Sequence, residues 1–263
     1  MNLNLKGKNA LVCGSTQGLG KAAAVELAHL GANIILMARS HTALEQTLKE
    51  LPNQGQEHGT IVADFSSPEE VQKQLHLFSA THPNFTFHIL VNNTGGPPGG
   101  LITEAKIEEF ERAFAMHLKN NHLLATFVME GMKSCGYGRI INIISTSVKQ
   151  PLHGLGVSNT IRGAVASWAK TMANELGKYG ITVNNVLPGA TATARLQSII
   201  ESKAKKESKT IEVVEASMKS SIPAARFGKA EEIGAAVAFL ASPAAGYING
   251  INLPVDGGRT GCL

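Results

Sequence analysis

Three glycines stand between an apolar run and a segment of helical periodicity near the start of the chain. Gly14, Gly18 and Gly20 follow the apolar residues 11–13 and precede an alanine-rich stretch that starts at Lys21. Such a turn lets backbone N–H groups at a helix start approach a ligand without a Cβ in the way, and the helix dipole adds partial positive charge there. The pyrophosphate of a dinucleotide is the natural ligand for this arrangement. The pattern alone is a weak signal, because glycine-rich turns are common in α/β proteins.

The elements that must position this turn alternate between strands and helices along the chain. We expect strands at 10–12, 33–37, 60–63, 88–91, 139–144, 182–187 and 251–254, and helices at 21–30, 42–51, 68–80, 108–133, 158–178 and 230–240. The strands are short continuous apolar runs, which is typical of a sheet with helices on both faces. The predicted fold class is therefore α/β, a Rossmann-type doubly wound parallel sheet in a single domain over residues 1–263. Segment 190–221 lies outside the alternation, and we expect a substrate-side flap there, or else an exposed excursion.

The composition excludes several classes of protein. The 263 residues are 43% hydrophobic and carry a net charge of only +4, and the densest basic run, 203–209, is interrupted by an acid, so we expect no nucleic-acid partner. No apolar run approaches membrane-spanning length and none resembles a signal peptide, so we expect no membrane association. The three cysteines lack metal-ligand spacing, which favours a reduced, cytoplasmic setting and no metal site.

Further motifs follow the predicted strands in a fixed order. Besides the glycine turn they are Asp64, then Asn92-Asn93-Thr94-Gly95, then Ser145, then Pro188-Gly189, and finally Asp256-Gly257-Gly258. In this order the chain resembles the short-chain dehydrogenases/reductases of the classical type, and in particular the β-ketoacyl-carrier-protein reductase branch. The resemblance covers nearly the whole chain. Each motif is short, but the complete ordered set at strand ends is a specific signal.

The resemblance implies a dinucleotide site along these strand ends. Its residues would be Gly14, Ser15, Thr16, Gly18, Leu19, Gly20, Arg39, Asp64, Asn92, Gly95, Arg162, Pro188, Gly189 and Thr191. The hydroxyls of Ser15 and Thr16 would donate to the pyrophosphate, and Asn92 and Gly95 would line the adenosine ribose. Asp64 would lie near the adenine amino group, or would cap the helix that begins near residues 66–68, and the two roles are compatible.

The end of the second strand bears on which dinucleotide binds. An acidic side chain there would bind the ribose 2′-OH of NAD and repel a 2′-phosphate. The chain has no acid in Met37-Ala38-Arg39-Ser40, and the planar guanidinium of Arg39 suits a phosphate. We therefore expect NADP(H) in preference to NAD(H), against the alternative that Arg39 is an ordinary surface arginine.

The catalytic motif of the family is altered. In the family a serine polarises the substrate carbonyl, a tyrosine transfers the proton, and a lysine one helical turn later lowers the pKa of the tyrosine and holds the nicotinamide ribose. Counting from Ser145 with the usual spacing reaches Ser158 and Arg162, so Ser-x-x-x-Arg replaces Tyr-x-x-x-Lys. His117 stands where the family has an asparagine. Ser158 is a poor proton donor beside a tyrosine of pKa about 10, whereas Arg162 keeps the positive charge.

A substitute proton donor is expected in the loop 146–156, which follows Ser145. His153 is the first candidate, because an imidazole of pKa about 6.5 donates and accepts near neutral pH. Lys149 is the second, and water held by Ser158 or bulk solvent are further sources. The alternative is that His153 is an ordinary loop histidine and that His117 is a buried structural one.

Two functions are compatible with these residues. The first is an NADP(H)-dependent oxidoreductase that acts on a small-molecule carbonyl or alcohol, similar to the 3-ketoacyl reductases. The second is a non-catalytic dinucleotide-binding protein, a sensor or a partner subunit. In relatives the helix at 158–178 packs against its copy, so a homodimer or homotetramer is expected, with the apolar stripe around Trp168 in the core or at the interface.

Overall fold

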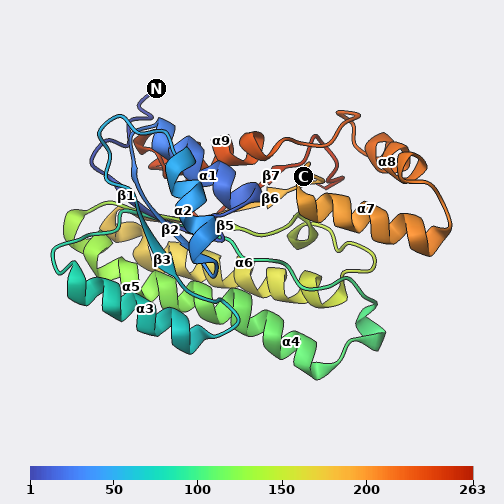
Figure 1. Ribbon diagram of the computed structural model, residues 1–263, viewed down its shortest axis with the longest axis horizontal. Helices are drawn as coiled ribbons and strands as arrows, with labels where there is room; N and C mark the ends of the chain where they lie inside the picture. Colours follow the sequence, from blue (N-terminus) through green and yellow to red (C-terminus); the bar gives the residue numbers. More distant parts are fainter. Residues whose placement is uncertain (263) are drawn as a thin grey trace.

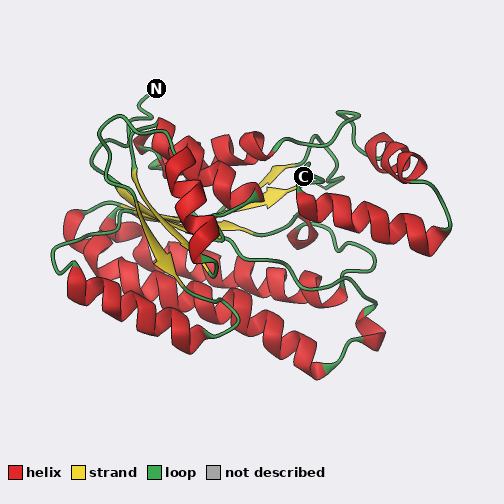
Figure 2. Ribbon diagram, viewed as in Figure 1, coloured by secondary structure: helices red, strands yellow, loops and turns green. Residues whose placement is uncertain are grey.

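The centre of the computed structural model, which describes residues 1–262, is one parallel sheet of seven strands (Figures 1 and 2). The strands are β1 (Asn9–Cys13), β2 (Asn33–Ala38), β3 (Gly59–Val62), β4 (Ile89–Asn92), β5 (Gly138–Ile143), β6 (Ile181–Pro188) and β7 (Asn252–Val255). Their order across the sheet is β3-β2-β1-β4-β5-β6-β7, and every neighbouring pair is parallel. The predicted doubly wound α/β fold is confirmed.

Helices cover both faces of this sheet (Figure 1). One layer contains α1 (Gly18–His29), α2 (His41–Glu50) and α9 (Ala230–Ala241), and the other contains α3 (Pro68–Thr81), α5 (Asn120–Cys135) and α6 (Gly156–Leu176). Each layer closes its own apolar cluster against the strands, with Leu27 and Val237 buried on the first face and Leu75 and Val128 on the second. None of the helices within residues 1–262 is both long and apolar enough to span a membrane.

The helix expected at 108–133 is present in the structure and contains a local π-helical turn. It consists of α4 (Ile107–Phe114), a π-helical turn at Ala115–Lys119, and α5. The π turn adds a residue to the helix without any glycine or proline to mark it in the sequence. Such turns often occur at functional sites, and this one carries His117.

Segment 190–221 forms two helices beyond the carboxyl ends of β6 and β7. They are α7 (Ala194–Glu207) and α8 (Ile211–Ser220), and each begins at a threonine whose hydroxyl accepts a backbone N–H, Thr193 for α7 and Thr210 for α8. The two helices close a small apolar cluster of their own. Figure 1 shows them at the right, extending from the rest of the molecule.

The strand order creates a topological switch point between β1 and β4. The chain runs outward from β1 through β2 to β3 at the edge, and then returns to place β4 on the other side of β1. Loops that leave the carboxyl ends of β1 and β4 therefore diverge, and such crevices are where open α/β sheets bind ligands. The glycine turn and the loop after Asn92 lie at this point.

A ladder of four asparagines crosses the sheet from β4 to β7, at the carboxyl ends of β4 and β5, in the middle of β6 and at the first residue of β7. Asn92 pairs with Asn142, Asn142 with Asn185, and Asn185 with Asn252 in the strand register. Each Nδ2 donates to the Oδ1 of the next asparagine at 2.8 Å. We refer to these four residues as the asparagine ladder. It pairs amide groups that the sheet buries, with the Oδ1 of Asn92 left without a partner among the described residues, and it thereby ties the four strands to one another.

The asparagine ladder predicts an unequal cost of substitution along its length. Asn142→Ala leaves the Nδ2 of Asn92 and the Oδ1 of Asn185 buried without partners, so we expect the free energy of unfolding to fall by about 3 kcal/mol. Asn252→Ala removes one bond at the half-buried end and serves as the matched control, with an expected loss of about 1 kcal/mol. Urea unfolding of both variants measures this, and equal losses would contradict the ladder as a connected unit.

Candidate functional site

The glycine turn at the end of β1 is closed so tightly that side chains are excluded from it. Gly14 and Gly18 have φ values of +57° and +55°. A Cβ on Gly14 would lie 2.6 Å from the carbonyl oxygen of Asn93, and a Cβ on Gly20 would overlap the carbonyl oxygen of Gly14. The residue before α1, Gln17, makes no side-chain cap, so the first N–H groups of the helix are free for an anionic ligand. The turn therefore fits a dinucleotide pyrophosphate.

Asn93 attaches this turn to the end of β4. Its Nδ2 donates to the carbonyl oxygens of Gly14 at 3.2 Å and Cys13 at 3.4 Å. Sequence reasoning assigned Asn93 no role, because nothing local shows that it reaches a turn 79 residues earlier. Its neighbour Asn92, expected at the adenosine ribose, is buried and donates its Nδ2 to the asparagine ladder, while its Oδ1 has no partner among the described residues.

Ser15 also has a different role from the expected one. Its hydroxyl is buried, accepts from the N–H of Met37 at 3.0 Å and faces the carbonyl oxygen of the same residue. The side chain thus ties the turn to β2 and is not free to donate to a pyrophosphate. Thr16 and Leu19, in contrast, are half-buried at the turn.

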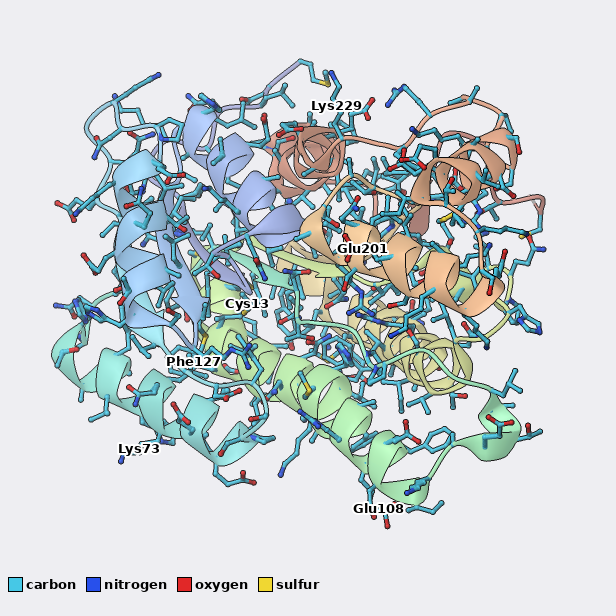
Figure 3. The ribbon with its side chains drawn as sticks, turned by 45° about the vertical axis from the view of Figure 1, so that its right-hand side comes forward. Cys13, Lys73, Glu108, Phe127, Glu201 and Lys229 are labelled. Atoms are coloured by element: carbon cyan, nitrogen blue, oxygen red, sulfur yellow. The ribbon has the colours of Figure 1, made fainter. Side chains whose placement is uncertain are left out.

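Cys13, the last residue of β1, is buried and is labelled in Figure 3. Burial raises the pKa of its thiol, which is therefore unreactive.

Arg39 and Asp64 follow the neighbouring strands β2 and β3. Arg39 is exposed, and the next residue, Ser40, caps α2 by accepting from the N–H of Ala43. Asp64 accepts from the N–H of Ser66 at 2.8 Å, and this bond, with a smaller contribution from the charge of Arg39, lowers the pKa of the carboxyl. The cap of α3 is Ser67 rather than Asp64.

The loop after β6 contacts the glycine turn through Thr193. A Cβ on Gly189 would lie 2.7 Å from Asp256, so the Pro188-Gly189 and Asp256-Gly257-Gly258 motifs pack on each other. Thr191 is buried and donates to the carbonyl oxygen of Gly189. The methyl group of Thr193, which sequence reasoning did not select, lies 3.7 Å from the Cβ position of Gly18. In Figure 3 the label Glu201 marks α7, the helix that follows Thr193.

The hydroxyl of Ser145 has no hydrogen-bond acceptor among the described residues. Its Oγ accepts from the N–H of Ser147 at 3.1 Å, so the acceptor function is satisfied while the O–H stays free. Ser158 is half-buried in the first turn of α6 and makes no side-chain hydrogen bond to any described residue. Arg162, one turn further along α6, is only 7% exposed and donates from Nη1 to the carbonyl oxygen of Ile143 at 3.2 Å. The structure thus places Ser145 and Arg162 at the same end of β5.

His117 projects from the π turn into the interior and is 2% exposed. Its Nδ1 lies 2.6 Å from the Oγ1 of Thr94, in the loop after β4, and its Nε2 is buried without a partner among residues 1–262. Burial, with smaller contributions from the charges of Arg162 and Arg195, lowers the pKa of the imidazole to about 2. His117 is therefore neutral at physiological pH.

Arg195 is a site residue that sequence reasoning missed. It lies in the first turn of α7 and donates from Nη1 to the carbonyl oxygen of Gly96 and from Nη2 to that of Pro97, both at 3.1 Å. The contact joins residues that are 99 positions apart in the sequence, so no local sequence pattern predicts it. The side chain joins the loop after β4 to the loop after β6.

None of the three tyrosines lies at the carboxyl edge of the sheet beside Ser145 and Arg162. His153 is exposed, and no hydrogen bond connects it with the other site residues within the described chain. Tyr137, Tyr179 and Tyr247 each precede a strand, which places all three tyrosines at the amino edge of the sheet. The assignment of His153 as the acid stays a prediction.

Comparisons with known proteins agree with this architecture. The family described as enoyl-(acyl carrier protein) reductase matches residues 14–260. The 3-oxoacyl-(acyl-carrier-protein) reductase FabG of Pseudomonas aeruginosa is 34% identical over 263 residues, or 97% of this chain and 98% of its own. The 2-dehydro-3-deoxy-D-gluconate 5-dehydrogenase of Bacillus subtilis is 35% identical over 261 residues, or 97% and 95%. The crystal structure of L-sorbose reductase from Gluconobacter frateurii, complexed with NADPH and L-sorbose, has a TM-score of 0.92, 29% identity and coverage of 100% of both chains.

The depressed pKa of His117 predicts acid sensitivity of the fold. The folded-state pKa of about 2 lies below the ordinary 6.5, so the contribution to stability is complete above pH 6.5 and is lost as the pH falls toward 2. We expect a loss of about 1.4 kcal/mol per pH unit from this group, and a shallower slope in His117→Asn.

Urea unfolding of both proteins between about pH 7 and pH 5 measures the difference. Burial also lowers the pKa of His88 to about 4, but His88 is present in both proteins, so its contribution cancels in the difference between the two curves. Parallel curves of unfolding free energy against pH would contradict the assignment.

Proposed function

The chain belongs to the short-chain dehydrogenase/reductase family, and on that premise we propose that it is an NADP(H)-dependent oxidoreductase acting on a small-molecule carbonyl/alcohol pair. The observation that carries the proposal is the glycine turn at the switch point, beside a Ser145 hydroxyl that is free to donate. The relatives that are named reductases and dehydrogenases, and the neighbour complexed with NADPH, support it.

Four features of the chain would hold the cofactor. The N–H groups of the glycine turn would bind the pyrophosphate, with the turn kept in shape by Asn93. Arg39, at the end of β2, would bind the 2′-phosphate, and Arg162 would take the place of the family's lysine at the nicotinamide ribose. The bound cofactor supplies the hydride, and the protein supplies position and charge.

The chemistry assigned to the chain's own residues is stabilisation of negative charge on the substrate oxygen. The free O–H of Ser145 donates to that oxygen, and the guanidinium of Arg162 compensates the charge that develops on it. The proton then comes from His153 or from water held by Ser158. His117, neutral and bonded to Thr94, acts as a positioning residue for the loop after β4.

Segment 190–221 and the apolar surface of α4 extend the proposal. The helices α7 and α8 form a flap on the substrate side, since Arg195 of α7 contacts the loop after β4. Ile107 and Phe114 are 68% and 48% exposed, and such apolar exposure supports a homodimer or homotetramer. The proposed location is the cytoplasm.

A second function is favoured by one observation. Both the tyrosine and the lysine of the family are absent from α6, and the three tyrosines of the chain lie at the other edge of the sheet. A protein that binds the dinucleotide without oxidising or reducing it, as a sensor or a partner subunit, would have the same glycine turn.

A paired binding and turnover experiment distinguishes the two functions. NADPH is titrated by fluorescence, and its oxidation is followed with a panel of ketones, β-ketoesters and quinones. We expect binding and turnover, with Ser145→Ala lowering kcat about a hundredfold while NADPH affinity is unchanged. Tight binding with no turnover and no hydride exchange would contradict the enzyme and assign the non-catalytic function.

Cofactor preference is tested at Arg39 through binding alone. Arg39→Asp places a carboxylate beside the 2′-phosphate, so we expect NADPH affinity to fall at least about tenfold while NADH affinity is retained or improved. Lys49→Asp, the same charge reversal at the exposed far end of α2, should leave both affinities unchanged. An unaltered ratio in Arg39→Asp would remove Arg39 from the cofactor site.

A further inference from the structure

Two arginines from separate helices meet beside Gly96 without an acidic partner. The position that a Cβ on Gly96 would occupy lies 2.8 Å from Nη2 of Arg195 and 3.6 Å from Nη2 of Arg162. Neither arginine takes part in an ion pair anywhere in the described chain. We refer to these two residues as the arginine pair.

The burial of Arg162 makes this arrangement energetically unfavourable on its own. A guanidinium taken out of water needs a counter-charge or a full set of acceptors, and the only hydrogen bond that Arg162 makes from its side chain within residues 1–262 is to Ile143. Burial and the like charge of Arg195 lower the pKa of Arg162 to about 10, so it is still a cation at neutral pH. An anion between the two groups would offset both costs, and a carboxylate matches a guanidinium through two parallel hydrogen bonds.

The neighbourhood of the arginine pair also lacks a competing charge of the protein. The nearby imidazole of His117 is neutral, and its Nε2 is buried without a hydrogen-bond partner in the described structure. A neutral imidazole beside two cations is compatible with an anion, whereas a carboxylate side chain would exclude one. The charges of the pair are therefore not compensated by any acidic side chain of the described chain.

The location of the pair favours the substrate as the source of the anion. Arg162 contacts the carbonyl oxygen of Ile143, two residues before Ser145, whose free hydroxyl marks the position of the substrate carbonyl. The pyrophosphate has its own donors in the glycine turn at the end of β1. On the basis of the proposed function, we propose that the arginine pair binds a carboxylate of the substrate, which is therefore an oxo acid in the reductive direction and a hydroxy acid in the oxidative one.

The test compares an oxo acid with its uncharged amide in the protein saturated with NADP⁺, which cannot reduce either. Calorimetric titration with 2-oxobutanoate and 2-oxobutanamide gives the ratio of their affinities. We expect the acid to bind at least about tenfold more tightly, as a charge-assisted pair implies. Equal affinities would overturn the inference.

Three variants identify the residues responsible. Arg195→Gln, at an exposed position, should abolish the preference for the acid, while Arg162→Lys, which keeps the charge but not the fork, should reduce it in part. Lys178→Gln removes a positive charge at the amino edge of the sheet and should leave the preference intact. We use Arg162→Lys in place of Arg162→Gln because the lysine keeps a positive charge at this buried position, whereas the neutral glutamine could prevent folding.

The same titrations separate this inference from the proposed function. An NADP⁺ affinity that falls at least about tenfold in Arg195→Gln, with the acid preference retained, would overturn the inference and assign the arginine to a cofactor phosphate. An NADP⁺ affinity within about twofold of wild type, with the preference lost, would support it. Failure of the wild-type protein to bind NADP⁺ contradicts the proposed function, and bound NADP⁺ with no preference contradicts this inference alone.

Discussion

Three amide–amide hydrogen bonds at 2.8 Å join the four neighbouring strands β4, β5, β6 and β7 through the asparagine ladder. Every loop of the site on that side of the sheet begins within a few residues of a ladder asparagine. Thr94 follows Asn92, Ser145 follows Asn142, and Gly189 follows Asn185. Because the four strands cannot shift independently, the side chains that follow them keep their spacing without a ligand, and preorganisation of this kind is what electrostatic catalysis requires.

The two halves of the site differ in how far they follow the family pattern. The cofactor half keeps its glycines for a physical reason, since a Cβ on Gly14 or Gly20 would collide with Asn93 or with the turn itself. In the proposed catalytic half, Ser158 and Arg162 stand where the family pattern has a tyrosine and a lysine, and Arg195 of α7 lies near Arg162. The exchange removes a titrating phenol and places permanent positive charge beside Ser145, which favours stabilising an oxyanion over transferring a proton from a side chain.

Sequence reasoning predicted the strands, the main helices and the glycine turn because each depends on local periodicity or on a short motif. It missed Asn93 and Arg195, whose contacts span 79 and 99 residues, and it assigned Ser15 to a ligand although the hydroxyl is bonded to β2. It also did not predict the π turn that carries the buried His117. These errors share a cause: the partner of a polar side chain is decided by tertiary packing, which the residue type does not reveal.

On the proposed function, hydride transfer survives in a centre without tyrosine and lysine. Hydride transfer is tested most directly by incubating the protein with NADPH deuterated at the transferring position and a panel of 2-oxo acids, and by analysing the products by mass spectrometry. We expect one deuterium on the carbinol carbon of a hydroxy acid with the wild-type protein, and far less with Ser145→Ala. Bound NADPH that transfers no deuterium to any acid or neutral carbonyl would contradict it.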